Sequence, residues 1–265
     1  MPTSTTVTKL TRKLTGHPER VVRVYVWELP VRITHWTTVL TLITLSISGA
    51  YMNWPFLVTT GNLTWTMAQM RTIHIISAYI FTCSYIVRAY WFLAGNRFAN
   101  WKQFIPVQRT RWADFRAMLK YYGFLRWEPV PEIGHNALAG VAYCWVFLLI
   151  IIQIVTGFVL LDNFLHTSAV LHFFVGWIPR VIDIQWIRAI HYFCMFAFGA
   201  FFIHHIYSAM VISNEERSGL MDSIFTGYKF VPEYEIDREK VLEQVERGTS
   251  APHQPVPAAP PPPVF

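Results

Sequence analysis

Four segments of the chain are almost wholly apolar, and each is long enough to cross a membrane as a helix. A hydrocarbon core requires about 20 consecutive residues of mostly apolar helix. Within the segments the only charged side chain is Arg88, near the end of the second. The segments cover residues 34–52, 72–94, 137–161 and 189–212. The pattern therefore predicts an all-α fold, an integral membrane four-helix bundle.

Histidines recur in the fourth segment at a helical spacing. His191 and His205 are 14 residues apart. At roughly 1.5 Å and 100° per residue, this is about 21 Å of travel and nearly four whole turns. Both imidazoles therefore face the same way, near opposite sides of a bilayer. His204 lies about 220° around the helix from His191, so we expect it to face another helix, a lipid headgroup or a partner subunit.

Composition and charge support a membrane protein and predict its orientation. The chain is 53% hydrophobic and 14% charged, more apolar than an average soluble protein. Lys and Arg beside membrane spans stay preferentially on the cytoplasmic side. They are frequent in the N-terminal arm and in the loop between the second and third segments, and sparse in the other two loops. Both chain ends are therefore expected in the cytoplasm. This orientation, together with attraction to anionic lipid, explains the excess of basic residues, so no nucleic-acid partner is required.

The histidines pair at two depths in this orientation. His74 opens the second segment on the outer side, at the level of His191, and His35 opens the first segment on the inner side, at the level of His205. Axial ligation of haem requires two imidazoles on facing helices at a common depth. We therefore expect two haems, with these four histidines as axial ligands of the iron. No Cys-x-x-Cys-His motif occurs, so the haems are expected to be b-type.

Further residues are candidates for contacts with the predicted haems. Arg71 and Arg88 lie near the outer and inner levels, where each could pair with propionates. Exposure at a helix end is the alternative for Arg71, and snorkelling to the interface is the alternative for Arg88. Small residues in the segments leave room for a macrocycle, although they serve helix packing equally well. These are Gly49, Gly157 and Gly199.

The turn before the third segment is a candidate polar site beside the inner haem. It carries His135 and Asn136 at the cytoplasmic level of the inner haem. A helix-capping role for Asn136 is the alternative, because Asn is a favoured N-cap residue. His135 has an ordinary pKa near neutrality and could deliver a proton. In the outer loop, His166 and His172 are expected to face water.

The chain divides into an arm over residues 1–33, a membrane domain over 34–230 and a C-terminal region over 231–265. The arm is polar and basic, so no cleavable signal peptide is expected. Residues 235–248 have the spacing of a short surface helix, and a proline-rich tail follows. No internal repeat is evident in the sequence.

Several motifs, taken in order, resemble the b-type cytochrome subunit of membrane-bound nickel-iron hydrogenases, a cytochrome b561-like family. The resemblance covers residues 25–230. It depends on residues 25–36 (YVWELPVRITHW), 71–74 (RTIH), Tyr90-Trp91 with 95–97 (GNR), 134–139 (GHNALA), the 191–205 span and Gly227-Tyr228. The paired-histidine arrangement is shared with the membrane subunits of formate dehydrogenase and thiosulfate reductase.

The resemblance implies a function in the bacterial cytoplasmic (inner) membrane. A di-haem subunit of this kind anchors the small (iron-sulfur) and large hydrogenase subunits and passes electrons to menaquinone or ubiquinone, while hydrogen oxidation lies on the partners. The quinone site is then expected at the inner level, beside the turn of His135 and Asn136. The family's ligands match His35, His74, His191 and His205. The outer loop after the third segment is shorter than in the family, and the proline-rich tail is extra.

Three alternatives remain at this stage. The equivalent subunit of formate dehydrogenase or of a related periplasmic oxidoreductase would differ in its partner. A metal-ion transporter would require carboxylates beside the histidines, and the predicted segments contain none. A structural anchor without a cofactor would leave four costly polar side chains unexplained.

Overall fold

The computed structural model describes residues 21–55, 65–105, 109–127, 130, 133–165, 168–216, 218–233 and 236. Most of the N-terminal arm, His166, the predicted surface helix except for residue 236, and the proline-rich tail lie outside the described residues. Contacts divide the chain into two units, one made of residues 1–23 and 230–265 and the other of residues 24–229. The second unit carries all four predicted haem ligands.

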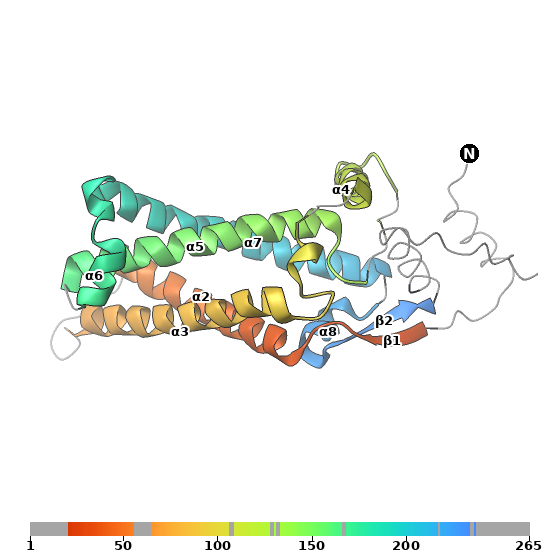
Figure 1. The fold of residues 1–265 in the computed structure, drawn as a ribbon, viewed down its shortest axis with the longest axis horizontal. Coiled ribbons are helices and arrows are strands. Elements are labelled where there is room, and N and C mark those ends of the chain that lie inside the picture. The colour runs from red at the N-terminus through yellow and green to blue at the C-terminus, as the bar shows by residue number, and fades with distance from the viewer. Residues whose placement is uncertain are drawn as a thin grey trace, which may run out of the picture. The chain divides into compact units, whose positions relative to one another are not determined.

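Four long helices run side by side in this unit (Figure 1), and each contains one predicted segment. They are α2 (Leu29–Asn53), α3 (Thr66–Ala94), α5 (Ala137–Leu165) and α7 (Ile184–Glu216). Among the described residues, α3, α5 and α7 are long and apolar enough to cross a membrane. α2 has the length but is less apolar, because it is rich in Thr and Ser.

The buried hydroxyls of α2 each have an acceptor within the helix itself. Thr34, Thr41 and Ser48 are buried, and each donates a hydrogen bond of 2.7 to 2.8 Å to the carbonyl four residues before it. Such back-bonding is compatible with an apolar environment, since no hydroxyl proton is left without an acceptor. The lower hydropathy of α2 is therefore no obstacle to its burial among the other helices.

Packing is closest within two helix pairs, α2 with α3 and α5 with α7. A core cluster joins α3, α5 and α7 and consists of Phe81, Ile150, Cys194 and Phe198. Phe198 lies halfway along α7 between His191 and His205, so an apolar layer separates the two histidine levels. Many outward side chains are also apolar, as expected of a surface that faces lipid; examples are Ile80, Leu148, Ile151, Phe193 and Ile203.

The structure adds elements that the periodicity did not predict, so the all-α description is incomplete. β1 (Val21–Tyr25) pairs with β2 (Tyr228–Pro232) in a two-stranded sheet. β1 reads VVRVY, whose β-branched residues favour a strand, but five residues are too few to stand out beside the helical pattern. Helix α4 (Arg109–Tyr122) lies in the long basic loop, and the short helices α6 (Ala169–Val175) and α8 (Leu220–Thr226) flank α7.

Motif residues outside the long helices fix the start of α2. The Glu28 carboxylate accepts hydrogen bonds of 2.8 Å from the Trp91 indole and from the Asn96 backbone N–H. The Asn96 amide donates to the Val26 carbonyl at 3.0 Å, and the Trp27 indole donates to the Ser223 hydroxyl at 2.9 Å. These bonds tie the start of α2 to the end of α3 and to α8, and so hold the turn that carries His35.

Candidate functional site

The outer histidine pair joins α3 to α7. The ring centroids of His74 and His191 are 6.4 Å apart. Each imidazole is also held from a neighbouring helix by a hydroxyl: Nδ1 of His74 lies 2.9 Å from Oγ of Ser48 on α2, and Nδ1 of His191 lies 2.9 Å from Oγ1 of Thr156 on α5. The same arrangement therefore occurs on both sides of the pair.

The inner pair joins α2 to α7 with the same separation, 6.4 Å between the ring centroids of His35 and His205. Nδ1 of His205 lies 3.2 Å from the Tyr143 hydroxyl, and Phe201 stacks on the same ring at 5.5 Å. Nδ1 of His35 is buried and has no hydrogen-bond partner among the described residues. In the inner pair, therefore, one of the two Nδ1 atoms has a hydrogen-bond partner among the described residues, whereas both have one in the outer pair.

Both separations fit a shared haem iron. A metal–imidazole bond is about 2 Å long and a ring nitrogen lies roughly 1 Å from its ring centre, so two imidazoles on one iron have centroids about 6 Å apart. The observed 6.4 Å in both pairs agrees with this value. Imidazole is also an ordinary donor to haem iron. The residues present therefore fit two haems.

Two glycines leave space for the outer histidine rings because they have no Cβ. A Cβ on Gly49 would lie 3.3 Å from Cε1 of His74, and a Cβ on Gly157 would lie 3.1 Å from Cε1 of His191. A Cβ on Gly199 would meet nothing within 4 Å. Gly49 and Gly157 thus make room for the imidazoles themselves, a role that differs from the close approach of a macrocycle predicted from the sequence.

Positive charge gathers beside the inner pair. The Nη1 atom of Arg88 is buried and has no hydrogen-bond partner among the described residues, and its guanidinium lies 5.7 Å from the Phe104 ring centre. Burial lowers the pKa of His135 to about 3, and the nearby positive charges of Arg88, Arg111 and Lys229 act in the same direction. A buried cation favours an anionic partner, and haem propionates are such anions.

Comparison with known proteins shows a family match over nearly all of this unit. Residues 26–227 match the family described as prokaryotic cytochrome b561. The chain belongs to this family. A b-type cytochrome implies haem b, in agreement with the geometry of the histidine pairs, and the family and the apolar helices indicate a bacterial membrane protein.

Curated relatives from several bacteria are similar over most of the chain. The probable Ni/Fe-hydrogenase 1 B-type cytochrome subunit of Escherichia coli (strain K12) is 32% identical over 225 residues, which are 80% of this chain and 94% of the relative. The probable Ni/Fe-hydrogenase B-type cytochrome subunits of Cupriavidus necator and Rhodobacter capsulatus are each 30% identical, over 77% and 79% of this chain and 86% and 82% of the relatives. This member of the b561 family is therefore homologous to hydrogenase-associated cytochrome subunits.

The other predicted site residues lie in varied surroundings. Arg71 is exposed and its guanidinium lies 5.1 Å from the Phe164 ring centre. Asn136 accepts a hydrogen bond of 2.8 Å from the Ala139 backbone N–H, which is the capping geometry considered as the alternative. His135 is partly buried against Trp27, Phe104 and Tyr143. The quinone assignment of His135 and Asn136 stays a prediction.

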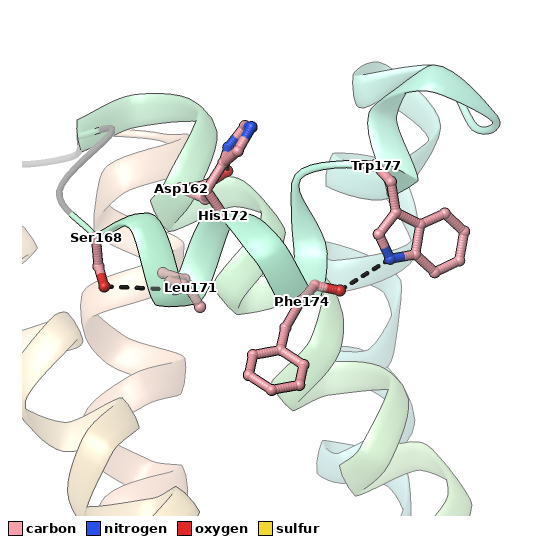
Figure 2. Close-up of polar contacts among 6 residues, drawn as sticks. All are labelled: Asp162, Ser168, Leu171, His172, Phe174 and Trp177. Carbon is pink, nitrogen blue, oxygen red and sulfur yellow. Dashed lines mark hydrogen bonds and ion pairs between the residues drawn. The ribbon is translucent and has the colours of Figure 1, made fainter.

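At the outer end, His172 has a partner that the sequence did not indicate. Figure 2 shows His172 on α6 beside Asp162, and Nδ1 lies 2.8 Å from Oδ2 of that carboxylate. Asp162 is buried and lies in the last turn of α5, because the helix continues to Leu165, beyond the predicted end of the third segment. His172 remains half exposed, at 54% of its side chain, so its expected contact with water is only part of its environment.

Sequence reasoning missed the side chains that hold the histidine rings. Ser48, Thr156 and Tyr143 are within hydrogen-bond distance of three imidazoles, and the Gln153 amide is within hydrogen-bond distance of Nε2 of His191. A Ser or Thr followed by Gly in an apolar segment, as at Ser48-Gly49 and Thr156-Gly157, is the available signal. It is a weak signal, because small residues are common at helix contacts in membranes.

Proposed function

We propose that the chain is the di-haem b-type cytochrome subunit of a membrane-bound nickel-iron hydrogenase. It carries electrons from the iron-sulfur small subunit across the bacterial cytoplasmic membrane to quinone and anchors the small and large subunits. The observation that supports this most directly is the pair of equal 6.4 Å separations at two levels of α7. When bound, haem iron alternates between ferric and ferrous forms and so supplies one-electron transfer.

The orientation follows from the charge pattern. With α2, α3, α5 and α7 as a four-helix membrane bundle and the basic segments inside, both termini lie in the cytoplasm. His74 and His191 then face the hydrogenase, and His35 and His205 face a quinone site beside the turn of His135 and Asn136. The curated relatives are named as Ni/Fe-hydrogenase subunits, which favours hydrogenase over formate dehydrogenase as the electron donor.

The protein supplies position, charge and exclusion of water. Helices α3 and α7 hold the outer imidazoles at one depth, and the layer of Phe81, Ile150, Cys194 and Phe198 excludes water between the levels. We assign Arg88 to the inner propionates because its buried Nη1 atom has no partner among the described residues. Arg71, which is exposed at the outer level, is assigned to the outer propionates.

Purification of the chain with its bound partners tests the proposal. A reduced-minus-oxidised absorption spectrum should show b-type haem, with two haems per chain, and hydrogenase subunits should co-purify. Hydrogen should then reduce an added quinone in the intact complex. Colourless protein from cells with ample haem would refute the cytochrome function, and co-purification of formate-oxidising subunits would refute only the donor.

Replacement of Arg88 by glutamine is expected to weaken binding of one haem about tenfold, as is typical when a partner of a bound metal group is removed. Glutamine remains polar but is shorter than arginine and lacks the charge. The measurement is the rate at which haem passes to an excess of a competing haem-free protein. Arg188→Gln, which changes an exposed arginine bonded to Gln185, is the control; equal rates in the two variants would contradict the propionate assignment.

A further inference from the structure

The hydroxyls of Ser48 and Thr156 in the outer site each make two kinds of hydrogen bond, one with a backbone carbonyl and one with an imidazole. Oγ of Ser48 lies 2.7 Å from the Thr44 carbonyl and 2.9 Å from Nδ1 of His74. On α5, Oγ1 of Thr156 lies 2.7 Å from the Ile152 carbonyl and 2.9 Å from Nδ1 of His191. In both cases one partner is a backbone carbonyl of the same helix and the other is an imidazole from a neighbouring helix.

This geometry determines where the imidazole protons lie. A hydroxyl has one hydrogen to donate, and a carbonyl oxygen can only accept. The Ser48 and Thr156 hydrogens therefore go to the carbonyls, and each hydroxyl oxygen accepts a hydrogen bond from Nδ1–H of its histidine. A neutral imidazole carries one N–H, so Nε2 of His74 and of His191 has the free lone pair.

A third side chain agrees with this protonation state. The amide nitrogen of Gln153 lies 3.3 Å from Nε2 of His191. An amide N–H can only donate, so it requires a lone pair on Nε2 and is consistent with the proton on Nδ1. The amide uses the lone pair through which His191 would bind iron, so this hydrogen bond would be given up when haem is bound.

The inner pair lacks such a constraint. The Tyr143 hydroxyl is 3.2 Å from Nδ1 of His205, and a phenol can donate or accept in that position. Nδ1 of His35 has no partner among the described residues. Of the four predicted ligands, His74 and His191 are therefore the two whose protonation state is set by helix hydroxyls among the described residues.

We propose that Ser48 and Thr156 are positioning residues that hold the Nδ1–H forms of His74 and His191, present Nε2 to the outer haem and lower its reduction potential. The proposal rests on the proposed di-haem function. An imidazole whose N–H is hydrogen-bonded is more basic, and a more basic axial ligand stabilises ferric over ferrous iron. Loss of either hydroxyl should therefore raise the potential of the outer haem and leave the inner haem unaffected.

The test uses the intact complex in native membranes and two readouts, haem b per chain and the midpoint potentials of both haems by redox titration. Ser48→Ala and Thr156→Val remove the acceptor, and Ser48→Thr and Thr156→Ser retain it. Thr41→Val is the matched control, because the Thr41 hydroxyl bonds the Thr37 and Thr38 carbonyls of its own helix. The outer haem is identified as the one lost in His74→Ala.

We expect Ser48→Ala and Thr156→Val to raise the outer potential or to lower outer-haem affinity by about 10- to 100-fold. The conservative variants and Thr41→Val should behave as the unmodified chain. Two bound haems with unchanged potentials in both Ser48→Ala and Thr156→Val would overturn the proposal, as would equal haem loss in the conservative variants. A chain that never binds haem would instead refute the di-haem function itself.

Discussion

Replacement of His205 by alanine is expected to remove one of two haems, whereas replacement of His204 should leave both in place. His205 faces His35 across 6.4 Å, so its loss leaves the iron with one protein ligand. His204 is exposed on the other side of α7 and its Nε2 lies 3.3 Å from the hydroxyl of Ser208 on the same helix. The measurement is haem b per purified chain, expected to fall from two to one only in His205→Ala.

The remaining ligand variants assign each haem to a level. His35→Ala should give the same residual spectrum as His205→Ala, and His74→Ala should match His191→Ala. The two residual spectra should add up to that of the unmodified protein. Full haem content in His205→Ala would reject the ligand assignment, and identical residual spectra in all four variants would reject the assignment to two levels.

Substitution of Gly157 by valine is expected to remove the outer haem while the inner haem stays bound. Even a single Cβ at this position would lie 3.1 Å from Cε1 of His191, and valine adds two further methyl groups to that Cβ. Overpacking of this kind costs about 1 to 3 kcal/mol, which the structure can relieve by turning the imidazole away. Haem content and the midpoint potential of the haem that remains would report the change.

Ala200→Val provides the control for Gly157→Val. Ala200 is exposed on α7, so a valine there adds comparable bulk to a membrane helix without meeting an imidazole. It should bind two haems. Gly49→Val, whose Cβ would lie 3.3 Å from Cε1 of His74, should resemble Gly157→Val. If Gly157→Val kept both haems with unchanged potentials, the glycine would have no part in seating His191.

Helical arithmetic alone predicts much of this arrangement. The rise and rotation per residue place His191 and His205 on one face at two depths, and the basic loops order the helices so that His74 and His35 lie at matching levels. The structure brings the same pairs together. The histidine pairs and their depths could be predicted because residue spacing in a long helix corresponds directly to distance along its axis.

Contacts between helices could not be predicted from residue spacing in this way. Ser48 and Thr156 read as ordinary helix hydroxyls, and only the packing of α2 on α3 and of α5 on α7 brings them to imidazoles. The partial burial of His135 depends likewise on residues distant in sequence, such as Trp27. The β1–β2 pairing depends on two short segments at opposite ends of the described chain, for which local periodicity carries no information.

The two helix pairs, α2 with α3 and α5 with α7, also have the same residue spacing between their polar side chains. The Ser48-Gly49 pair begins 13 residues after His35 and the Thr156-Gly157 pair begins 13 residues after Tyr143, while 14 residues separate His74 from Arg88 and His191 from His205. Exchanging one pair of helices for the other would swap the outer histidines with each other. It would exchange His35 for Tyr143, and His205 for Arg88. At the outer end both helix pairs therefore carry the same kinds of residue at the same spacing, whereas at the inner end a phenol and a guanidinium stand where the other pair carries histidines. This phenol and guanidinium lie where we place quinone, whose reduction consumes protons.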